Sequence, residues 1–463
     1  MTKTVSRRRF LQTASSAAAL GAAAYWVTDT PARAAHYTAK NDRPLVAAVG
    51  VGGRGMGDAR AAAHFGDMVA VCDVDLARAE RAKATFDGKP AVFQDYRKML
   101  DAHPEIEVVI NGSPDHWHTA INVAACRAGK DVYTEKPLTL TIEEGQILRR
   151  VVKETGRIVQ VGTQQRSQSA FRTVCELARN GRVGKIQQVA VLLPFKSYKG
   201  GPFPAAPVPP TLDWDLWQGQ APEREYRKER THYSFRFWWE YAGGKITDWG
   251  QHHLDIAHWG MGWEDTGPLE VEGRAFFPNR GIPNAYDNAD RFVTRMKYPG
   301  DIDVIFMVVR DKNYMQSMAD GDMTEAEDAE LFQGIPDQWR NEQREGIMFI
   351  GEKGRVFVNR GRAYGKAVEE LPENPLPADA IRLYESNDHM GNFFDCVKSR
   401  KQPISTVDVA HRVITACHLG NAAIHLKRKI KWDPVKEEVV GDAEASQSRY
   451  LRREQRAPYA IPT

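Results

Sequence analysis

Residues 44–73, PLVAAVGVGGRGMGDARAAAHFGDMVAVCD, decide the fold of this chain. An apolar run at 45–49 enters a turn in which Gly50, Gly52 and Gly55 keep the spacing G-x-G-x-x-G, with Gly53 and Arg54 inside it. An alanine-rich segment and a second apolar run at 68–72 follow. Strand, glycine turn, helix and strand in this order are typical of a dinucleotide-binding βαβ unit. The glycines permit the tight turn, the approach of a pyrophosphate and close helix packing.

Asp73 follows the second apolar run, about 20 residues after the glycine turn, where the fingerprint expects an acid. A carboxylate at this place binds the ribose hydroxyls of a dinucleotide and repels a 2′-phosphate. The sequence therefore predicts NAD as the cofactor in preference to NADP. The alternative is a purely structural βαβ turn, because glycine-rich turns also serve as plain loops.

Helix and strand signals continue to alternate as far as Gly162. Strand-like runs at 91–93, 107–111, 131–134 and 158–161 are separated by segments of helical period. Such alternation predicts a doubly wound parallel sheet of the α/β class, the Rossmann architecture, over residues 43–165. Ligands bind beyond the carboxyl ends of the strands in such sheets, so the residues that directly follow each strand are site candidates.

One of these strand ends leads into a polar turn. Ser113, Asp115 and His118 follow the run 108–111, and we expect them to contact the ribose and nicotinamide half of the cofactor. The structural alternative is a helix start at which Ser113 or Asp115 satisfies free N–H groups.

A second strand end is followed by Glu135, Lys136 and Pro137. Proline fixes the backbone after Lys136 and biases the lysine itself to an extended conformation. A lysine held there beside a nicotinamide can donate a hydrogen bond to the substrate hydroxyl and stabilise developing alkoxide charge. We therefore assign Lys136 to catalysis and Glu135 to the cofactor site. The alternative for Lys136 is a solvated surface lysine.

The glycine fingerprint, Asp73, the Ser113-Pro114-Asp115 turn and the Glu135-Lys136-Pro137 triplet together resemble the Gfo/Idh/MocA oxidoreductases. This family includes glucose-fructose oxidoreductase and inositol dehydrogenase, and the triplet is its most specific mark. The resemblance implies a Rossmann domain followed by an α/β domain whose large open sheet carries the substrate site on one face. It also implies NAD(P)-dependent chemistry on a CH–OH group, with substrates that are mostly sugars, polyols and their derivatives.

Asp248, His252 and Asp255 are spaced i, i+4 and i+7, so on a helix they share one face. The resemblance implies that Asp248 and His252 form the family's Asp-x-x-x-His pair, with His252 as the base for the hydroxyl proton and Asp248 as its orienting carboxylate. Histidine suits the role because its ordinary pKa lies near neutral pH. The alternatives for His252 are a structural core histidine and a metal ligand. His253 and His258 point elsewhere on the helix, so we expect no metal site.

The second half predicts a further domain over residues 166–435. Strand-like runs include 269–277, 291–298 and 302–310, and a Pro-Gly-Asp turn at 299–301 predicts a hairpin and hence a mainly antiparallel sheet. An aromatic arm at 214–241 is expected to pack or form a subunit contact, or else to stack on sugars. The charged stretch 311–344 is expected to be a solvated surface insertion, and the polar tail 436–463 to wrap a surface.

Residues 1–34 read as a targeting segment. A twin-arginine motif, SRRRFL at 6–11, precedes an alanine-rich run at 14–27 and small residues at 32–34 that form a cleavage site. The run is too short for a membrane-spanning helix. We predict export by the twin-arginine machinery, which transports folded and cofactor-loaded proteins, to the periplasm or the extracellular space. A disordered or membrane-tethered N-terminus is the alternative.

Composition agrees with a globular enzyme of two or three domains, since the 463 residues are 42% hydrophobic and 27% charged. The formal charge of +3 includes five cations and one acid from residues 1–34, so the remainder is close to neutral. A nucleic-acid partner is therefore excluded. The five widely spaced cysteines are interpreted as buried thiols, not as a disulfide framework or a zinc site.

These features predict an exported NAD(P)-dependent oxidoreductase that transfers hydride between nicotinamide and a hydroxyl of a sugar or polyol, with tightly bound cofactor. Outside the cytoplasm a released NADH has no ready partner, which favours recycling in place. The alternatives are a redox-neutral NAD-dependent glycosidase or epimerase acting through a transient keto-sugar, and a binding protein that has lost the chemistry. An open sheet face also predicts a homodimer or homotetramer.

Overall fold

The computed structural model describes residues 43–461, so the twin-arginine segment 1–34 lies outside the described residues. Its N-terminal part is a six-stranded, fully parallel sheet in the order β3-β2-β1-β4-β5-β6. The strands are β1 (Leu45–Val49), β2 (Asp67–Cys72), β3 (Ala91–Phe93), β4 (Val108–Asn111), β5 (Asp131–Thr134) and β6 (Val159–Val161). The order reverses between β1 and β4, which is where a doubly wound sheet binds its ligand.

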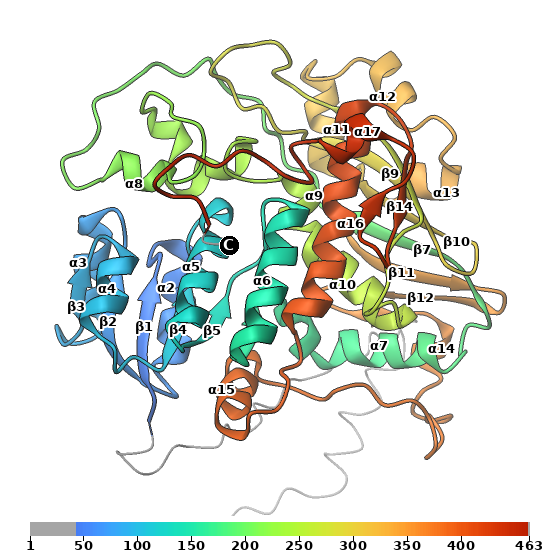
Figure 1. Cartoon of the computed structure of the whole chain (residues 1–463). Helices are drawn as coiled ribbons and strands as arrows, with labels where there is room; N and C mark the ends of the chain where they lie inside the picture. The colour runs from blue at the N-terminus through green and yellow to red at the C-terminus, as the bar shows by residue number, and fades with distance from the viewer. Residues whose placement is uncertain (1–42, 462–463) are drawn as a thin grey trace, which may run out of the picture.

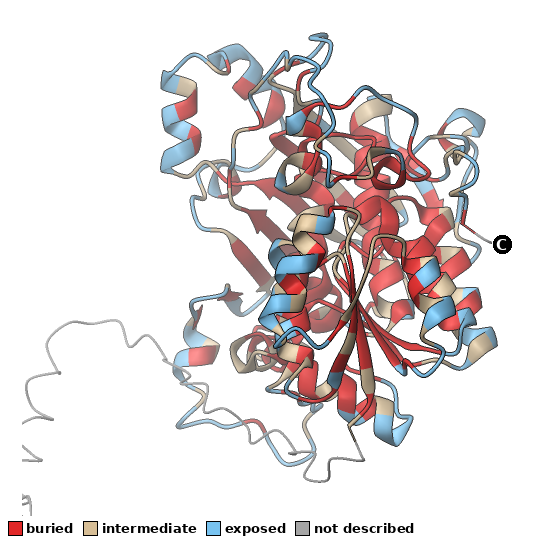
Figure 2. Ribbon diagram, turned by 90° about the vertical axis from the view of Figure 1, so that its left-hand side faces the viewer, coloured by how far each residue is buried: buried red, intermediate tan, exposed pale blue. Residues whose placement is uncertain are grey.

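Helices cover both faces of this sheet: α2 (Gly53–Ala62), α3 (Leu76–Thr85), α4 (Tyr96–Ala102), α5 (Asp115–Arg127) and α6 (Ile142–Thr155). The strands are buried, whereas the outer helices expose one side (Figure 2). One covering helix comes from far along the chain. The Phe394 ring of α15 (His389–Ser399) stacks on Phe65 at 5.2 Å between ring centroids. The parallel-sheet unit is therefore completed by residues beyond the predicted boundary at 165.

The second sheet has nine strands in the order β13-β12-β11-β7-β10-β9-β8-β14-β15. It comprises β7 (Ile186–Leu193), β8 (Glu270–Phe276), β9 (Arg291–Tyr298), β10 (Ile302–Val308), β11 (Gly346–Gly351), β12 (Gly354–Val358), β13 (Ala363–Tyr364), β14 (Ile430–Asp433) and β15 (Glu438–Val439). Its neighbours pair antiparallel except β7 and β10, which are parallel. The predicted α/β class, with one parallel and one mainly antiparallel sheet, is confirmed.

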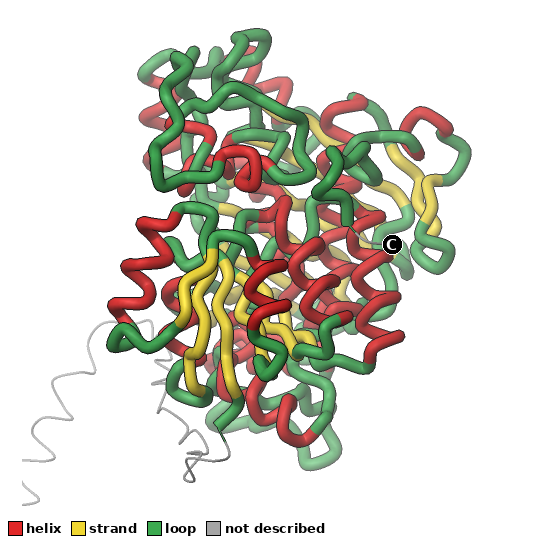
Figure 3. Tube along the Cα trace, turned by 60° about the vertical axis from the view of Figure 1, so that its left-hand side comes forward, coloured by secondary structure: helices red, strands yellow, loops and turns green. Residues whose placement is uncertain are grey.

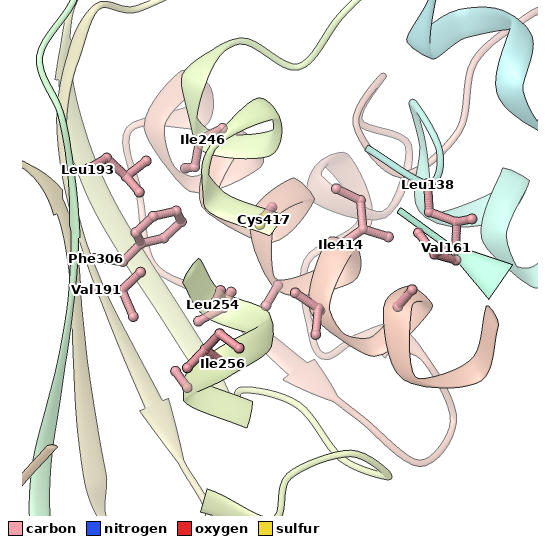
Figure 4. Packing of buried hydrophobic residues seen from close by; sticks show 14 of the residues in the cluster. Leu138, Val161, Val191, Leu193, Ile246, Leu254, Ile256, Phe306, Ile414 and Cys417 are labelled. Atoms are coloured by element: carbon pink, nitrogen blue, oxygen red, sulfur yellow. The ribbon is translucent and has the colours of Figure 1, made fainter. Parts of the chain in front are cut away.

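Helices of the second half lie between the two sheets: α7 (Ser169–Arg179), α9 (Lys245–Asp248), α10 (Gly250–Met261) and α16 (Val407–Leu426) (Figure 1). Figure 4 shows how they pack. Leu254 and Ile256 of α10 face Val191 and Phe306 of the sheet, and α16 fills the space towards the first domain. Helix α10 is buried from Gly250 to Gly260 because it has packed neighbours on every side. This burial fixes the position of His252.

The aromatic arm 214–241 forms its own buried cluster over the parallel sheet. It consists of the short helix α8 (Trp214–Gln218), two 3₁₀ turns at 228–230 and 232–237, and connecting loops (Figure 3). The segment leading into it is attached to the loop after β2, since Thr211 Oγ1 donates to Asp75 Oδ1 at 2.8 Å and Leu76 N donates to Thr211 O at 2.9 Å. The arm therefore packs within its own chain.

The C-terminal tail fastens this arm to the first domain. Arg456 Nη1 contacts Asp215 Oδ1 at 2.5 Å, and the Tyr459 hydroxyl donates to Asp215 Oδ2 at 2.6 Å. The Tyr459 ring also meets Trp117 of α5 edge-on at 5.9 Å. Helix α17 (Ala443–Ser446) opens this tail, and Leu451 and Ile461 are buried in it. In Figure 1 the tail crosses from α16 to α5.

Most of the stretch 311–344 is exposed, as expected of a solvated surface insertion, but it also has a buried side. The stretch folds into α11 (Lys312–Ala319), α12 (Glu325–Leu331) and α13 (Asp337–Arg340), and it buries Tyr314, Phe332 and Trp339. The Trp339 indole donates to Gln188 Oε1 of β7 at 2.7 Å. The few apolar residues among many charges were enough to dock the helices on the sheet. A further short helix, α14 (Lys366–Glu369), follows β13.

None of the helices between residues 43 and 461 is long and apolar enough to cross a membrane.

Candidate active site

A cavity of about 440 Å³ opens at the glycine turn after β1. Gly50 has a φ of +75°, and a Cβ there would lie 2.5 Å from Ser113 N. A Cβ on Gly55 would lie 1.9 Å from Gly50 O. Both positions therefore require glycine. Gly50, Gly52, Gly53 and Arg54 all line the cavity, whereas Gly55 is the close-packing position behind it.

Asp73 lines the same cavity and holds two turns together. Its Oδ2 accepts from Val51 N at 3.1 Å and its Oδ1 accepts from Asp75 N at 3.0 Å. Burial raises the pKa of Asp73 to about 6, against the opposing effect of these backbone hydrogen bonds and of Arg78. The carboxylate is thus positioned beside the glycine turn, where a ribose would bind.

The turn after β4 contributes Ser113 to the cavity wall, with its Oγ donating to Asn111 Oδ1 at 2.7 Å. Asp115 begins α5 and is buried, and its Oδ2 has no hydrogen-bond partner among the described residues. Burial raises the pKa of Asp115 to about 7. Neither Asp115 nor His118 is among the residues that line the cavity. The His118 ring lies between Pro137 O and Ser113 O, at 2.6 and 2.8 Å. It connects the two strand-end loops.

Glu135 contacts the side chains of Arg54 and Gln164 and does not itself line the cavity. Its Oε1 accepts from Arg54 Nε at 3.1 Å and from Gln164 Nε2 at 2.8 Å, and Arg54 pairs with Asp58 at 2.9 Å as well. Glu135 is buried and is not among the cavity-lining residues, whereas Arg54 is. The carboxylate therefore positions Arg54 at the edge of the cavity.

Lys136 is held by the segment that precedes His252. Its Nζ donates to Asp248 O and to Asp248 Oδ1, both at 2.7 Å, and the two side chains are 13% and 18% exposed. Burial alone would raise the Asp248 pKa, but the charges of Lys136 and Arg236 outweigh it and hold the pKa at about 2. Asp248 is therefore ionised, and Lys136 retains one donor of its three for another ligand.

His252 lies on α10 and is 6% exposed. The helix predicted through Asp248 is broken at Trp249, which separates α9 from α10. Asp248 consequently bonds Lys136, and His252 Nδ1 has no hydrogen-bond partner among the described residues. Burial and the charges of Lys136, Arg360 and Arg54 hold the His252 pKa well below its usual range. The imidazole is thus neutral, and the same surroundings oppose its protonation.

Asp255 does not join this site. It forms a two-point ion pair with Arg166, at 2.7 and 2.9 Å, in the interior of the protein. His253 and His258 face the nine-stranded sheet: His253 Nδ1 donates to Leu192 O, and His258 Nε2 shares a hydrogen bond with the Tyr298 hydroxyl. Among residues 43–461 no group of three or more His, Cys, Asp or Glu side chains could hold a metal ion. All five cysteines are buried free thiols.

Sequence reasoning missed the residues that close the site. Trp217, Tyr233, Phe235 and Arg236 of the aromatic arm line the cavity opposite the glycine turn. Arg236 Nε lies 4.0 Å from Asp248 Oδ2, so it joins the cavity to the Lys136–Asp248 pair. Gln251 Oε1 accepts from Leu138 N at 2.8 Å, which ties α10 to the loop that carries Lys136. Only the aromatic content of the arm gave a signal, and it did not indicate which residues face inward.

The residues present fit a dinucleotide. Gly52, which precedes α2, makes no side-chain cap, so the first N–H groups of that helix are free for a pyrophosphate. Asp73 lies at the ribose position and apolar rings cover the cavity from the far side. Such a combination of apolar wall and few polar groups is usual for a cofactor site.

Comparison with known proteins agrees with this geometry. Residues 45–163 match the oxidoreductase family described as GFO_IDH_MocA with an NAD-binding Rossmann fold, and residues 195–305 and 342–461 match its C-terminal alpha/beta domain. The scyllo-inositol 2-dehydrogenase (NAD(+)) of Bacillus subtilis (strain 168) is 26% identical over 339 residues, which cover 73% of this chain and 81% of that protein.

Two further matches cover a shorter segment of the chain or have a lower sequence identity. The scyllo-inositol 2-dehydrogenase (NADP(+)) of the same organism is 30% identical over 125 residues, 27% of this chain and 34% of that protein. The solved structure of myo-inositol 2-dehydrogenase from Lactobacillus plantarum shares the fold, with a TM-score of 0.55 and 16% identity over 84% of this chain and 99% of that one. The chain therefore belongs to the Gfo/Idh/MocA family of NAD(P)-dependent oxidoreductases that act on CH–OH groups.

Proposed function

We propose that this protein oxidises a hydroxyl of a carbohydrate or polyol with NAD, and that it retains the nucleotide between turnovers. The observation that carries the proposal is the Lys136–Asp248 pair, which holds a lysine donor next to the helix of His252 and is joined to the cofactor cavity by Arg236. The bound nicotinamide supplies a hydride acceptor for the C–H bond of the substrate carbon.

The chain's own residues handle the hydroxyl proton and the oxygen. His252 is a neutral imidazole in a buried site and takes the proton as the C–OH becomes C=O. Lys136 directs its remaining N–H at the same oxygen and stabilises negative charge as the O–H bond breaks. Asp248 is a positioning residue, because it binds Lys136 at two points instead of touching His252.

Retention of the cofactor is supported by the arm and the tail. The arm covers the cavity, and Trp117 Nε1 donates to Trp217 O at 3.1 Å while Arg456 and Tyr459 hold Asp215. Release of a nucleotide would require several of these contacts to break together. We also propose NAD over NADP, because a 2′-phosphate would lie against the Asp73 carboxylate.

The function is tested with His252→Ala in the protein purified with its nucleotide. The variant is expected to bind sugar about as the wild type does, measured by calorimetry, and to lose formation of the reduced nicotinamide absorbance at 340 nm. Wild-type protein that binds sugar but never reduces the nicotinamide or converts the sugar would contradict the proposal and indicate a binding protein. Conversion of the sugar without net NADH would indicate the redox-neutral glycosidase or epimerase instead.

We propose in addition that the protein is exported by the twin-arginine route. The motif at 6–11 supports this. Replacement of Arg7 and Arg8 by lysine should leave the full-length chain in the cytoplasmic fraction, whereas an unchanged distribution would contradict export by this route.

A further inference from the structure

Arg360 is a cation near His252, and within the described part of the chain it forms no ion pair. It lies in the turn between β12 and β13, and no carboxylate of residues 43–461 comes within 4.0 Å of its guanidinium. The two neighbouring acids that interact with Arg360 most strongly are Glu345 and Asp248, and both are beyond ion-pair distance. Asp248 binds Lys136, and Glu345 is nearest to His253 at 3.6 Å.

The guanidinium is nevertheless held in place. It lies over the Trp249 ring, 4.6 Å from the centroid, in a cation–π contact. With its amide oriented to satisfy both neighbours, the buried Gln165 accepts from Arg360 Nε at 3.2 Å and donates to His252 O at 2.8 Å. One residue, Gln165, therefore connects Arg360 to the backbone of the proposed base.

The turn itself is rigid. Asn359 Oδ1 accepts from Gly361 N at 2.9 Å and from Arg362 N at 3.1 Å, and Asn359 N donates to Arg362 O at 2.9 Å. Arg360 is exposed, so its remaining N–H groups are accessible, while the Trp249 ring and Gln165 hold its side chain. An arginine held with its planar donors open is suited to bind an oxyanion at two points.

The charge balance of the site leads to the same conclusion. Lys136 is paired with Asp248, and Arg54 is paired with Glu135 and Asp58. Arg360 also lowers the His252 pKa, and no carboxylate of residues 43–461 forms an ion pair with it. Proton transfer to His252 adds a further positive charge there. A neutral sugar offers nothing to offset it, but an anionic substituent beside Arg360 would.

We infer that the substrate carries an anionic substituent, a carboxylate or a phosphate, and that Arg360 binds it while His252 and Lys136 address the hydroxyl. The inference deepens the proposed function and rests on it. It makes Arg360 a specificity-determining residue, supplied by a hairpin of the second sheet and not by the cofactor domain.

Calorimetric binding to the nucleotide-loaded full chain tests it without requiring turnover. The probes are matched sets: D-glucose, D-glucuronate and D-glucose 6-phosphate, and D-galactose with D-galacturonate. An acidic member is expected to bind at least about tenfold more tightly than its neutral counterpart, as charge-assisted bonds allow. The acidic sugar that binds more tightly than its neutral counterpart shows whether the site prefers a carboxylate or a phosphate.

The variant Arg360→Gln should reduce that preference to about twofold or less and leave the neutral sugars unaffected. Arg362→Gln is the matched control, since this exposed arginine lies two residues away in the same turn. Equal binding of acidic and neutral members, or equal effects of the two substitutions, would overturn the inference alone. Failure of every sugar, acidic or neutral, to bind or to reduce the nicotinamide would overturn the proposed function and this inference with it.

Discussion

Replacement of Lys136 by methionine removes one cation and keeps most of the side-chain volume. In the structure two of the three ammonium donors are occupied by Asp248 O and Oδ1, so one remains for the substrate oxygen. Loss of a single donor to a developing oxyanion costs about 10²–10³ in kcat, or about 2.7–4 kcal/mol. We expect a decrease of this size, with sugar affinity changed much less.

A second effect follows from the partner carboxylate. Asp248 has a pKa of about 2 because Lys136 and Arg236 outweigh its burial. In Lys136→Met the burial penalty is less opposed, so the Asp248 pKa rises. The charge of Lys136 also lowers the His252 pKa, so its removal raises that pKa and moves the acid limb of the pH–rate profile, which needs the neutral imidazole, to higher pH.

The assay is single-turnover formation of absorbance at 340 nm by the nucleotide-loaded protein after mixing with sugar, from pH 4 to 9. Lys153→Met, at an exposed position on α6, is the control and should behave as the wild type. A kcat for Lys136→Met within about tenfold of wild type, together with an unmoved pH profile, would refute the assigned role of Lys136.

Three other outcomes are expected. Burial raises the pKa of Asp73 to about 6, and a ribose hydroxyl donates to the ionised carboxylate. Retention of NAD in dialysis should therefore weaken as the pH falls through about 6, and this pH dependence should vanish in Asp73→Asn. Arg456→Gln should speed nucleotide release, which can be monitored by fluorescence, whereas Arg452→Gln at an exposed position should not. Equal release rates in the two variants would contradict the role of Arg456 in retaining the nucleotide. Arg166→Met should lower the free energy of unfolding by about 3–5 kcal/mol in denaturant titration by stranding Asp255, and a loss below about 1 kcal/mol would contradict that reasoning.

Local sequence pattern was sufficient for the first domain. Periodicity located all six parallel strands, and the predicted run 131–134 coincides with β5. The spacing of Gly50, Gly52 and Gly55 indicated the turn that borders the cavity, because the steric needs of such a turn are local and leave few residue choices.

Other features of the site depend on contacts between distant parts of the chain, which local sequence pattern does not reveal. The helix through Asp248 and His252 breaks at Trp249, so two residues at helical spacing do not bond each other. His118 has polar neighbours from two separate loops, which no spacing rule reveals. Arg360 lies in an ordinary hairpin turn and gains its significance only from Gln165 and Trp249, far away in the chain.

The mass and absorbance spectra of the purified protein, before and after addition of sugar, test the central claim most directly. The account predicts NAD that leaves only on denaturation and an absorbance at 340 nm that rises when an acceptable sugar is added. Protein that holds no nucleotide and exchanges NAD freely would contradict retention. A bound nucleotide that no carbohydrate or polyol can reduce would contradict the proposed oxidation itself.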